Sequence, residues 1–122
     1  MKSILKTIAV LISVSIVIAG CSYEKEEILP QACEIDDVVT YSADISGIIQ
    51  SNCFACHNNN FKEGNVSLEG FENVQKVANG GELINVISHT QGFAKMPKGA
   101  AKLDDCTIQT VEKWIDSGTP VN

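Results

Sequence analysis

This sequence of 122 residues contains no arginine, and its nine lysines are outnumbered by fifteen acidic residues. The formal net charge is −6 at pH 7. Contacts to phosphate groups need a basic surface, so this balance is unfavourable for nucleic-acid binding. We therefore expect no nucleic-acid partner.

An alternating strand pattern and internal repeats are also lacking, which favours an all-α fold. Hydrophobic residues make up 44% of the chain and charged residues 20%, a composition that excludes disorder throughout. The length suits one ordinary domain and is short for two.

The longest apolar run stands at the start of the chain and is short for a membrane-spanning helix. It covers residues 8–18, follows Lys2 and Lys6, and is interrupted by two serines. Because a spanning helix needs about 20 apolar residues, this arrangement is typical of a secretory signal peptide. We predict a signal over residues 1–20, with an uncleaved anchor helix as the alternative.

Small residues lead from this run into Cys21, in the order Ile18-Ala19-Gly20-Cys21. This order resembles the lipobox of bacterial lipoproteins, which implies cleavage before Cys21 and acylation of that cysteine. We expect an exported lipoprotein, periplasmic or associated with the outer membrane, held by its acyl chains. Residues 21–37 are acidic and indicate a solvated tether. They also resemble the surface-export signals of some bacterial lipoproteins, which would place the protein on the cell surface.

Short helices joined by long polar loops are expected over residues 38–122. Helices are predicted after Ser42, which would cap the first, and over residues 71–78, 83–88 and 104–116. In the first helix, Ile45, Ile48 and Ile49 share one face. Such short helices bury little surface, and small domains usually need a staple or a bound group to complete their core.

The segment Cys53-Phe54-Ala55-Cys56-His57 matches C-x-x-C-H, the attachment signature of c-type haem. Two thiols one helical turn apart can reach the two vinyl groups of one haem, and the next imidazole can bind the iron. The alternatives are a thioredoxin-like dithiol, a structural zinc site and a simple disulfide. A thioredoxin-like dithiol needs a βαβ context, and a zinc site needs a further pair of ligands. A simple disulfide does not require His57. We therefore predict one covalently bound haem c.

A second iron ligand is expected in the loop over residues 92–103. Met96 precedes Pro97 and lies 39 residues after His57, and it is the only methionine apart from the initiator. A thioether favours ferrous iron and suits electron transfer. His89 is the alternative ligand, although a lone histidine at a helix end more often makes a hydrogen bond.

The C-x-x-C-H motif after a short helix, the Met96-Pro97 pair and Trp114 in the final helix together resemble class I cytochrome c. The resemblance covers residues 38–122 and implies a small helical domain wrapped around one haem, with His57 and Met96 as axial ligands. It also implies that the first and last helices cross. The residues that should then meet are Ile45, Ile48 and Ile49 with Val111, Trp114 and Ile115.

Two features depart from that family's pattern. Residues 58–66 contain little apolar sequence, so less shielding of the haem is expected on that side. Cys33 and Cys106 are additional cysteines, and in an exported protein such a pair is expected to oxidise to a disulfide. Two free thiols are the alternative.

A haem iron with two strong axial ligands has no open position, so the expected function is one-electron transfer between redox proteins outside the cytoplasm, without enzyme activity. Lys95, Lys98 and Lys102 stand around Met96 and would steer an acidic partner, unless they only solvate the loop. The alternatives are a haem peroxidase or gas sensor in which Met96 is displaced, and a haem subunit of a larger redox complex.

Overall fold

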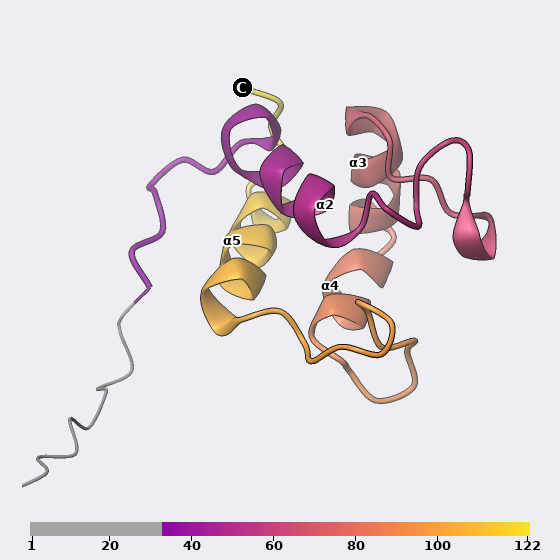
Figure 1. Cartoon of the computed structure of the whole chain (residues 1–122). Helices are drawn as coiled ribbons and strands as arrows, with labels where there is room; N and C mark the ends of the chain where they lie inside the picture. Colours follow the sequence, from indigo (N-terminus) through magenta and orange to yellow (C-terminus); the bar gives the residue numbers. More distant parts are fainter. Residues whose placement is uncertain (1–32) are drawn as a thin grey trace, which may run out of the picture. The chain divides into compact units, whose positions relative to one another are not determined.

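The computed structural model describes residues 33–122, which form helices and loops with no strand in that range (Figure 1). The predicted all-α class is therefore confirmed for this part of the chain. The predicted signal over residues 1–20, the lipidation of Cys21 and the tether as far as residue 32 lie outside the described residues. Within residues 33–122, no helix has the length and apolar character needed to cross a membrane.

Residues 33–122 contain six helical elements in this order: η1 (Tyr41–Ile45), α2 (Ser46–Asn52), η2 (Glu63–Asn65), α3 (Phe71–Asn79), α4 (Glu82–Ile87) and α5 (Asp105–Asp116). The π-helical turn η1 runs directly into α2, and η2 is a single 3₁₀ turn. The three later helices match the helices predicted from apolar spacing to within one residue at each end. Figure 1 shows the long loops that separate α2 from α3 and α4 from α5.

The first helix begins two residues earlier than predicted, because Thr40 and not Ser42 is its N-cap. The Thr40 hydroxyl accepts a hydrogen bond from the backbone N–H of Ala43 (3.2 Å), and the Thr40 N–H donates to the Asp44 carboxylate (2.8 Å). Thr40 has the extended backbone that an N-cap requires, whereas Ser42 already lies inside the helical turn. The Ser42 hydroxyl instead donates to the side chain of Asn122 (2.8 Å).

The hydrophobic core joins the two ends of the described chain. The residues expected to meet belong to one buried cluster or pack against it: Ile45, Ile48 and Ile49 with Val111, Trp114 and Ile115. Trp114 is fully buried, and its Nε1–H donates to the carbonyl oxygen of Pro120 (2.9 Å). The same carbonyl accepts the N–H of Tyr41 (2.9 Å), so the C-terminus lies beside η1 (Figure 1).

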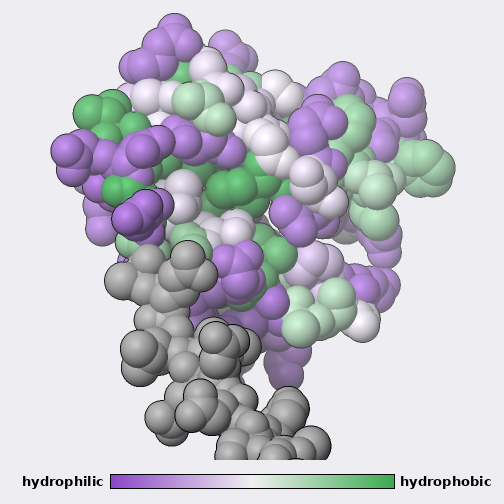
Figure 2. Space-filling view, turned by 60° about the vertical axis from the view of Figure 1, so that its left-hand side comes forward, coloured by the Kyte–Doolittle hydropathy of each residue, from purple (hydrophilic) through white to green (hydrophobic). Residues whose placement is uncertain are grey.

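The second half of the core comes from α3 and α4, which pack on each other, while α4 also packs on α5. Val74 and Ala78 of α3 and Leu83 and Ile87 of α4 are buried. Gly81 connects the two helices with a φ of +77°, a left-handed conformation that glycine adopts without steric cost. On the face shown in Figure 2, hydrophobic residues gather at the centre of the folded part between hydrophilic segments, so apolar surface reaches the exterior there.

Candidate functional site

A cavity of about 630 Å³ lies between α2, α3, α4 and the loops that follow α2 and α4. Pockets for small molecules and cofactors commonly measure about 300–1,000 Å³. The wall of this cavity is mainly apolar, and it includes Leu68, Leu83 and Ile87 from the buried core. The cavity therefore reaches into the centre of the helical unit, where the short helices leave the core incomplete.

The C-x-x-C-H motif occupies a turn that prolongs α2. Cys53 is the C-cap of this helix, and its carbonyl oxygen accepts the backbone N–H groups of Cys56 (3.2 Å) and His57 (3.0 Å). The N–H of Phe54 donates to the carbonyl oxygen of Ile49 (3.0 Å), which continues the helical pattern across the boundary. This tight turn brings both thiols and the imidazole to the cavity wall.

The ring of His57 is oriented by one backbone group. Its Nδ1 atom lies 3.2 Å from the carbonyl oxygen of Val66. Because a carbonyl oxygen can only accept a hydrogen bond, Nδ1 is the protonated nitrogen of the neutral ring, and Nε2 then keeps its lone pair. The backbone N–H of Leu68 also donates to the His57 carbonyl (2.7 Å), so the segment after the Asn-rich loop holds the residue at two points. A histidine fixed in this way is prepared to bind a metal through Nε2.

The two motif cysteines are free thiols with different surroundings. Cys53 is partly buried, and burial raises the pKa of its thiol to about 11. Cys56 is exposed. At neutral pH the Cys53 thiol is therefore protonated, which is unlike the low-pKa attacking cysteine of thioredoxin-type dithiols. Within residues 33–122, no group of three or more His, Cys, Asp or Glu side chains could together hold a metal ion.

Met96 lines the same cavity, although the loop that carries it lies far along the chain from the motif. Its backbone N–H donates to the carbonyl oxygen of Val86 in α4 (3.1 Å), and its side chain is partly buried. The Met96–Pro97 peptide bond is cis. His89 does not line the cavity, and its ring contacts the backbone of Met96. Of the two candidates for a second iron ligand, only Met96 has access to the cavity.

Charged residues of both signs stand at the cavity wall or near it: Glu63, Lys95 and Lys98 line the cavity, and Lys102 and Asp105 do not. Lys98 forms an ion pair with Glu63 (3.2 Å), and Lys102 forms one with Asp105 at the start of α5. Within the described residues, Lys95 has no ion-pair partner. The positive cluster suggested by the spacing of these lysines is thus partly neutralised by acidic neighbours of Lys98 and Lys102.

Residues 58–66 border one side of the cavity and contribute little apolar surface to its wall, as their polar sequence predicts. Phe61, the only aromatic residue among them, is 75% exposed and does not line the cavity. Glu63, Gly64 and Val66 form the wall there. The Asn58 side chain accepts the N–H groups of residues 60 and 61 and shapes this turn. Shielding on this side therefore comes from backbone and one valine.

Sequence reasoning did not identify the backbone partners of the site. The carbonyl oxygens of Val66 and Val86 orient His57 and Met96, and every residue type carries a carbonyl group. The one usable signal is the Asn-rich turn directly after His57, since asparagine favours a tight reversal that returns the chain to the motif.

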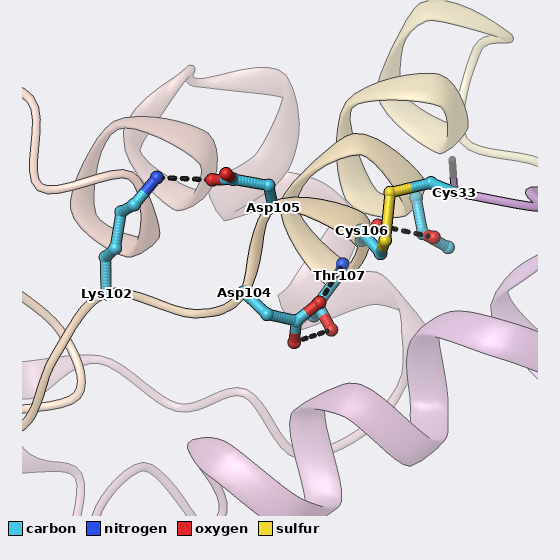
Figure 3. The surroundings of a disulfide bond; sticks show 7 residues. Cys33, Lys102, Asp104, Asp105, Cys106 and Thr107 are labelled. Atoms are coloured by element: carbon cyan, nitrogen blue, oxygen red, sulfur yellow. Dashed lines mark hydrogen bonds and ion pairs between the residues drawn. A yellow bond between two sulfur atoms is a disulfide. The ribbon is translucent and has the colours of Figure 1, made fainter. Parts of the chain in front are cut away.

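Cys33 and Cys106, the remaining cysteines of the described chain, are joined by a disulfide with a Cα–Cα distance of 5.3 Å (Figure 3). This is the pairing predicted from the sequence. Neither residue lines the cavity. Figure 3 also shows Asp104, the N-cap of α5, next to the disulfide. The disulfide thus fixes the start of α5, directly after Leu103 at the cavity wall.

Comparisons of the chain with protein-family models, with curated proteins and with solved structures found no match.

Proposed function

We propose that this protein is a membrane-tethered c-type cytochrome, which carries one covalent haem and transfers single electrons between redox proteins outside the cytoplasm. One observation carries the proposal: the C-x-x-C-H motif and Met96 line the same largely apolar cavity. The motif is local in sequence, whereas Met96 reaches the cavity only through folding. Such a set, with two thiols, one imidazole and one thioether, fits the attachment and ligation of a c-type haem.

When bound, the haem would supply the one-electron chemistry through its iron. The side chains would hold the group: the thiols of Cys53 and Cys56 would attach it, and Nε2 of His57 and the thioether of Met96 would bind its iron. Apolar residues such as Leu83 and Ile87 exclude water, which favours the less charged ferrous form. Two protein ligands on the iron would leave no position for a substrate, which favours an electron carrier over an enzyme.

Exposed groups at the cavity rim support brief docking of a partner. Cys56 is exposed, so the cavity wall is accessible at the attachment motif. Lys95 has no acidic partner among residues 33–122 and would attract an acidic surface. We expect weak docking that weakens further as salt rises, because exposed charges are screened within about 10 Å at 0.1 M salt.

The test is production of the full chain in a host that attaches haem c, followed by denaturing electrophoresis and mass spectrometry. We expect one haem that stays with the polypeptide after denaturation. The Cys53→Ser/Cys56→Ser variant should carry no covalent haem, while Cys33→Ser/Cys106→Ser should keep it. Absence of covalent haem from the unaltered protein would overturn the proposal.

The ferric absorption spectrum separates the electron carrier from the enzyme or sensor. A low-spin spectrum with the weak long-wavelength band of methionine ligation supports electron transfer. A high-spin spectrum would instead favour a peroxidase or gas sensor with an open iron position. Co-purification of the haem protein with a stable redox complex would favour a subunit role.

A further inference from the structure

The ring of His89 is attached to the backbone of Met96. Its Nε2 atom lies 3.1 Å from the Met96 carbonyl oxygen. The carbonyl can only accept, so Nε2 carries a proton and donates it to this hydrogen bond. This hydrogen bond uses Nε2, and His89 does not line the cavity, so its contact with Met96 gives it a role other than ligation.

The backbone N–H of Met96 is held by the last turn of α4. Its N–H donates to the carbonyl oxygen of Val86 (3.1 Å), a residue that also lines the cavity. Both backbone polar groups of Met96 are therefore bonded to the same short stretch of chain, the N–H to Val86 and the carbonyl to His89. The intervening residues form a closed loop, in which Phe93 also donates its N–H to Thr90 (3.2 Å).

His89, whose ring contacts the Met96 carbonyl, has a left-handed backbone conformation. Its φ is +56°, in the left-handed region that residues other than glycine seldom occupy. Histidine, asparagine and aspartate are more common there than other side chains. The left-handed residue ends the helical path of α4. Strained backbone of this kind persists where surrounding contacts hold it in place.

We propose that His89 is a positioning residue, which holds Met96 at the cavity wall so that its thioether can bind the haem iron. This inference rests on the proposed function. The neighbouring residues Phe93 and Lys95 are exposed, and the ion pair of Lys98 with Glu63 is also exposed, so few buried side-chain contacts hold the loop. Without the His89 bond, Met96 keeps only its N–H bond to Val86, and ligands from solution compete better for the iron.

The experiment compares three variants of the haem-loaded protein. His89→Asn keeps a side chain that tolerates the left-handed backbone, but it is too short to replace Nε2 of the ring. His89→Gln brings an amide donor closer to the position of Nε2. His89→Gly removes the ring and also relieves the backbone strain. Each is titrated with imidazole, which must displace Met96, and each ferric spectrum is recorded.

We expect His89→Asn and His89→Gly to bind imidazole about five-fold more tightly than the unaltered protein, the effect of losing one hydrogen bond. Their methionine band should weaken in parallel. His89→Gln should lie between them and the unaltered protein, because it restores a donor. A role in folding alone would lower stability to urea without changing imidazole affinity.

Unchanged imidazole affinity in His89→Asn and His89→Gly would overturn the inference, and so would an equal increase in all three variants. If His89→Asn does not fold, His89→Gly decides the question, since glycine has no strain at this φ. A methionine band that is missing already from the unaltered protein would contradict the proposed ligation by Met96. The two failures are therefore distinguishable.

Discussion

Cys33 and Cys106 form a disulfide that ties the beginning of the described chain to the first turn of α5, across 73 residues of sequence. A second contact follows about two turns further along α5, where Nζ of Lys113 donates to the carbonyl oxygen of Asp36 (2.6 Å). Ile35 between them packs against the core. The last residues of the acidic segment, predicted to belong to the tether, thus lie against α5.

The disulfide is expected to contribute strongly to stability, because it closes a long loop in the unfolded chain. The Cys33→Ser/Cys106→Ser variant should lose about 4 kcal/mol of unfolding free energy in the chain-entropy model. Urea unfolding of both proteins with haem bound measures the difference. Haem content is the internal control and should not change, since neither cysteine lines the cavity. Equal urea midpoints would contradict this prediction.

Trp114 combines a large buried surface with one hydrogen bond, and two substitutions separate these contributions. Trp114→Phe keeps an aromatic ring but removes the donor to Pro120, whose carbonyl still accepts the N–H of Tyr41. We expect it to cost about 1 kcal/mol for the hydrogen bond, and Trp114→Ala about 3–5 kcal/mol for the cavity. Urea unfolding checks both values. Equal losses in the two variants would show that the ring volume contributes little.

Helices and core were predictable because each follows from a short-range pattern. Spacings of three and four residues placed Ile45 and Ile49 on one face and Val111 with Ile115 on another, and burial of these faces does not depend on loop paths. The N-cap was missed because Thr40 and Ser42 are both capping residues. The folded backbone, extended at Thr40 and helical at Ser42, shows which one begins the helix, and Ser42 bonds to Asn122 instead.

The site was predictable only as far as side-chain chemistry identifies it. Cys53, Cys56 and His57 form a contiguous motif, and Met96 is the only thioether beyond the initiator. The hydrogen bonds of His57 to Val66 and of His89 to Met96 use backbone carbonyls. No residue type encodes such a partner, because the path of the intervening loop decides which carbonyl comes near.

Stability should depend on pH through Asp104, the N-cap of α5. Its carboxylate accepts hydrogen bonds from the Thr107 hydroxyl (2.6 Å) and the Thr107 backbone N–H (2.9 Å), and these hold the pKa of Asp104 below its ordinary range. A folded pKa below the unfolded value means that the stabilisation is complete above about pH 3.9 and is lost as pH falls through the folded value.

Two substitutions at this cap test that dependence. Asp104→Ala should lose about 1 kcal/mol at about pH 7, and the difference from the unaltered protein should shrink at about pH 2. Asp104→Asn keeps a capping oxygen and should be nearly as stable at neutral pH, without the acid-dependent loss. Urea unfolding at the two pH values provides the comparison. A pH-independent deficit in Asp104→Ala would contradict the assignment.

The predicted lipid anchor gives a prediction for Cys21, which lies outside the described residues. Cys21→Ser removes the acylated thiol, so the protein should leave the membrane fraction or keep an uncleaved signal. Fractionation and the intact mass of the product distinguish these outcomes. The same membrane attachment and mass pattern in both proteins would exclude acylation at this residue.

The proposed ligation of the iron by Met96 can be tested with two substitutions that keep a side chain of substantial size at the cavity wall. Leucine resembles methionine in volume, so Met96→Leu should cost less than about 1.5 kcal/mol of stability and remain folded. It removes the thioether, and imidazole or cyanide should then bind the ferric protein far more readily. Met96→His supplies a nitrogen ligand and should lower the reduction potential, because methionine ligation raises it. Spectra and potentiometric titration of the two variants measure these effects. A methionine band that persists in Met96→Leu, or a potential that stays unchanged in Met96→His, would show that Met96 does not bind the iron.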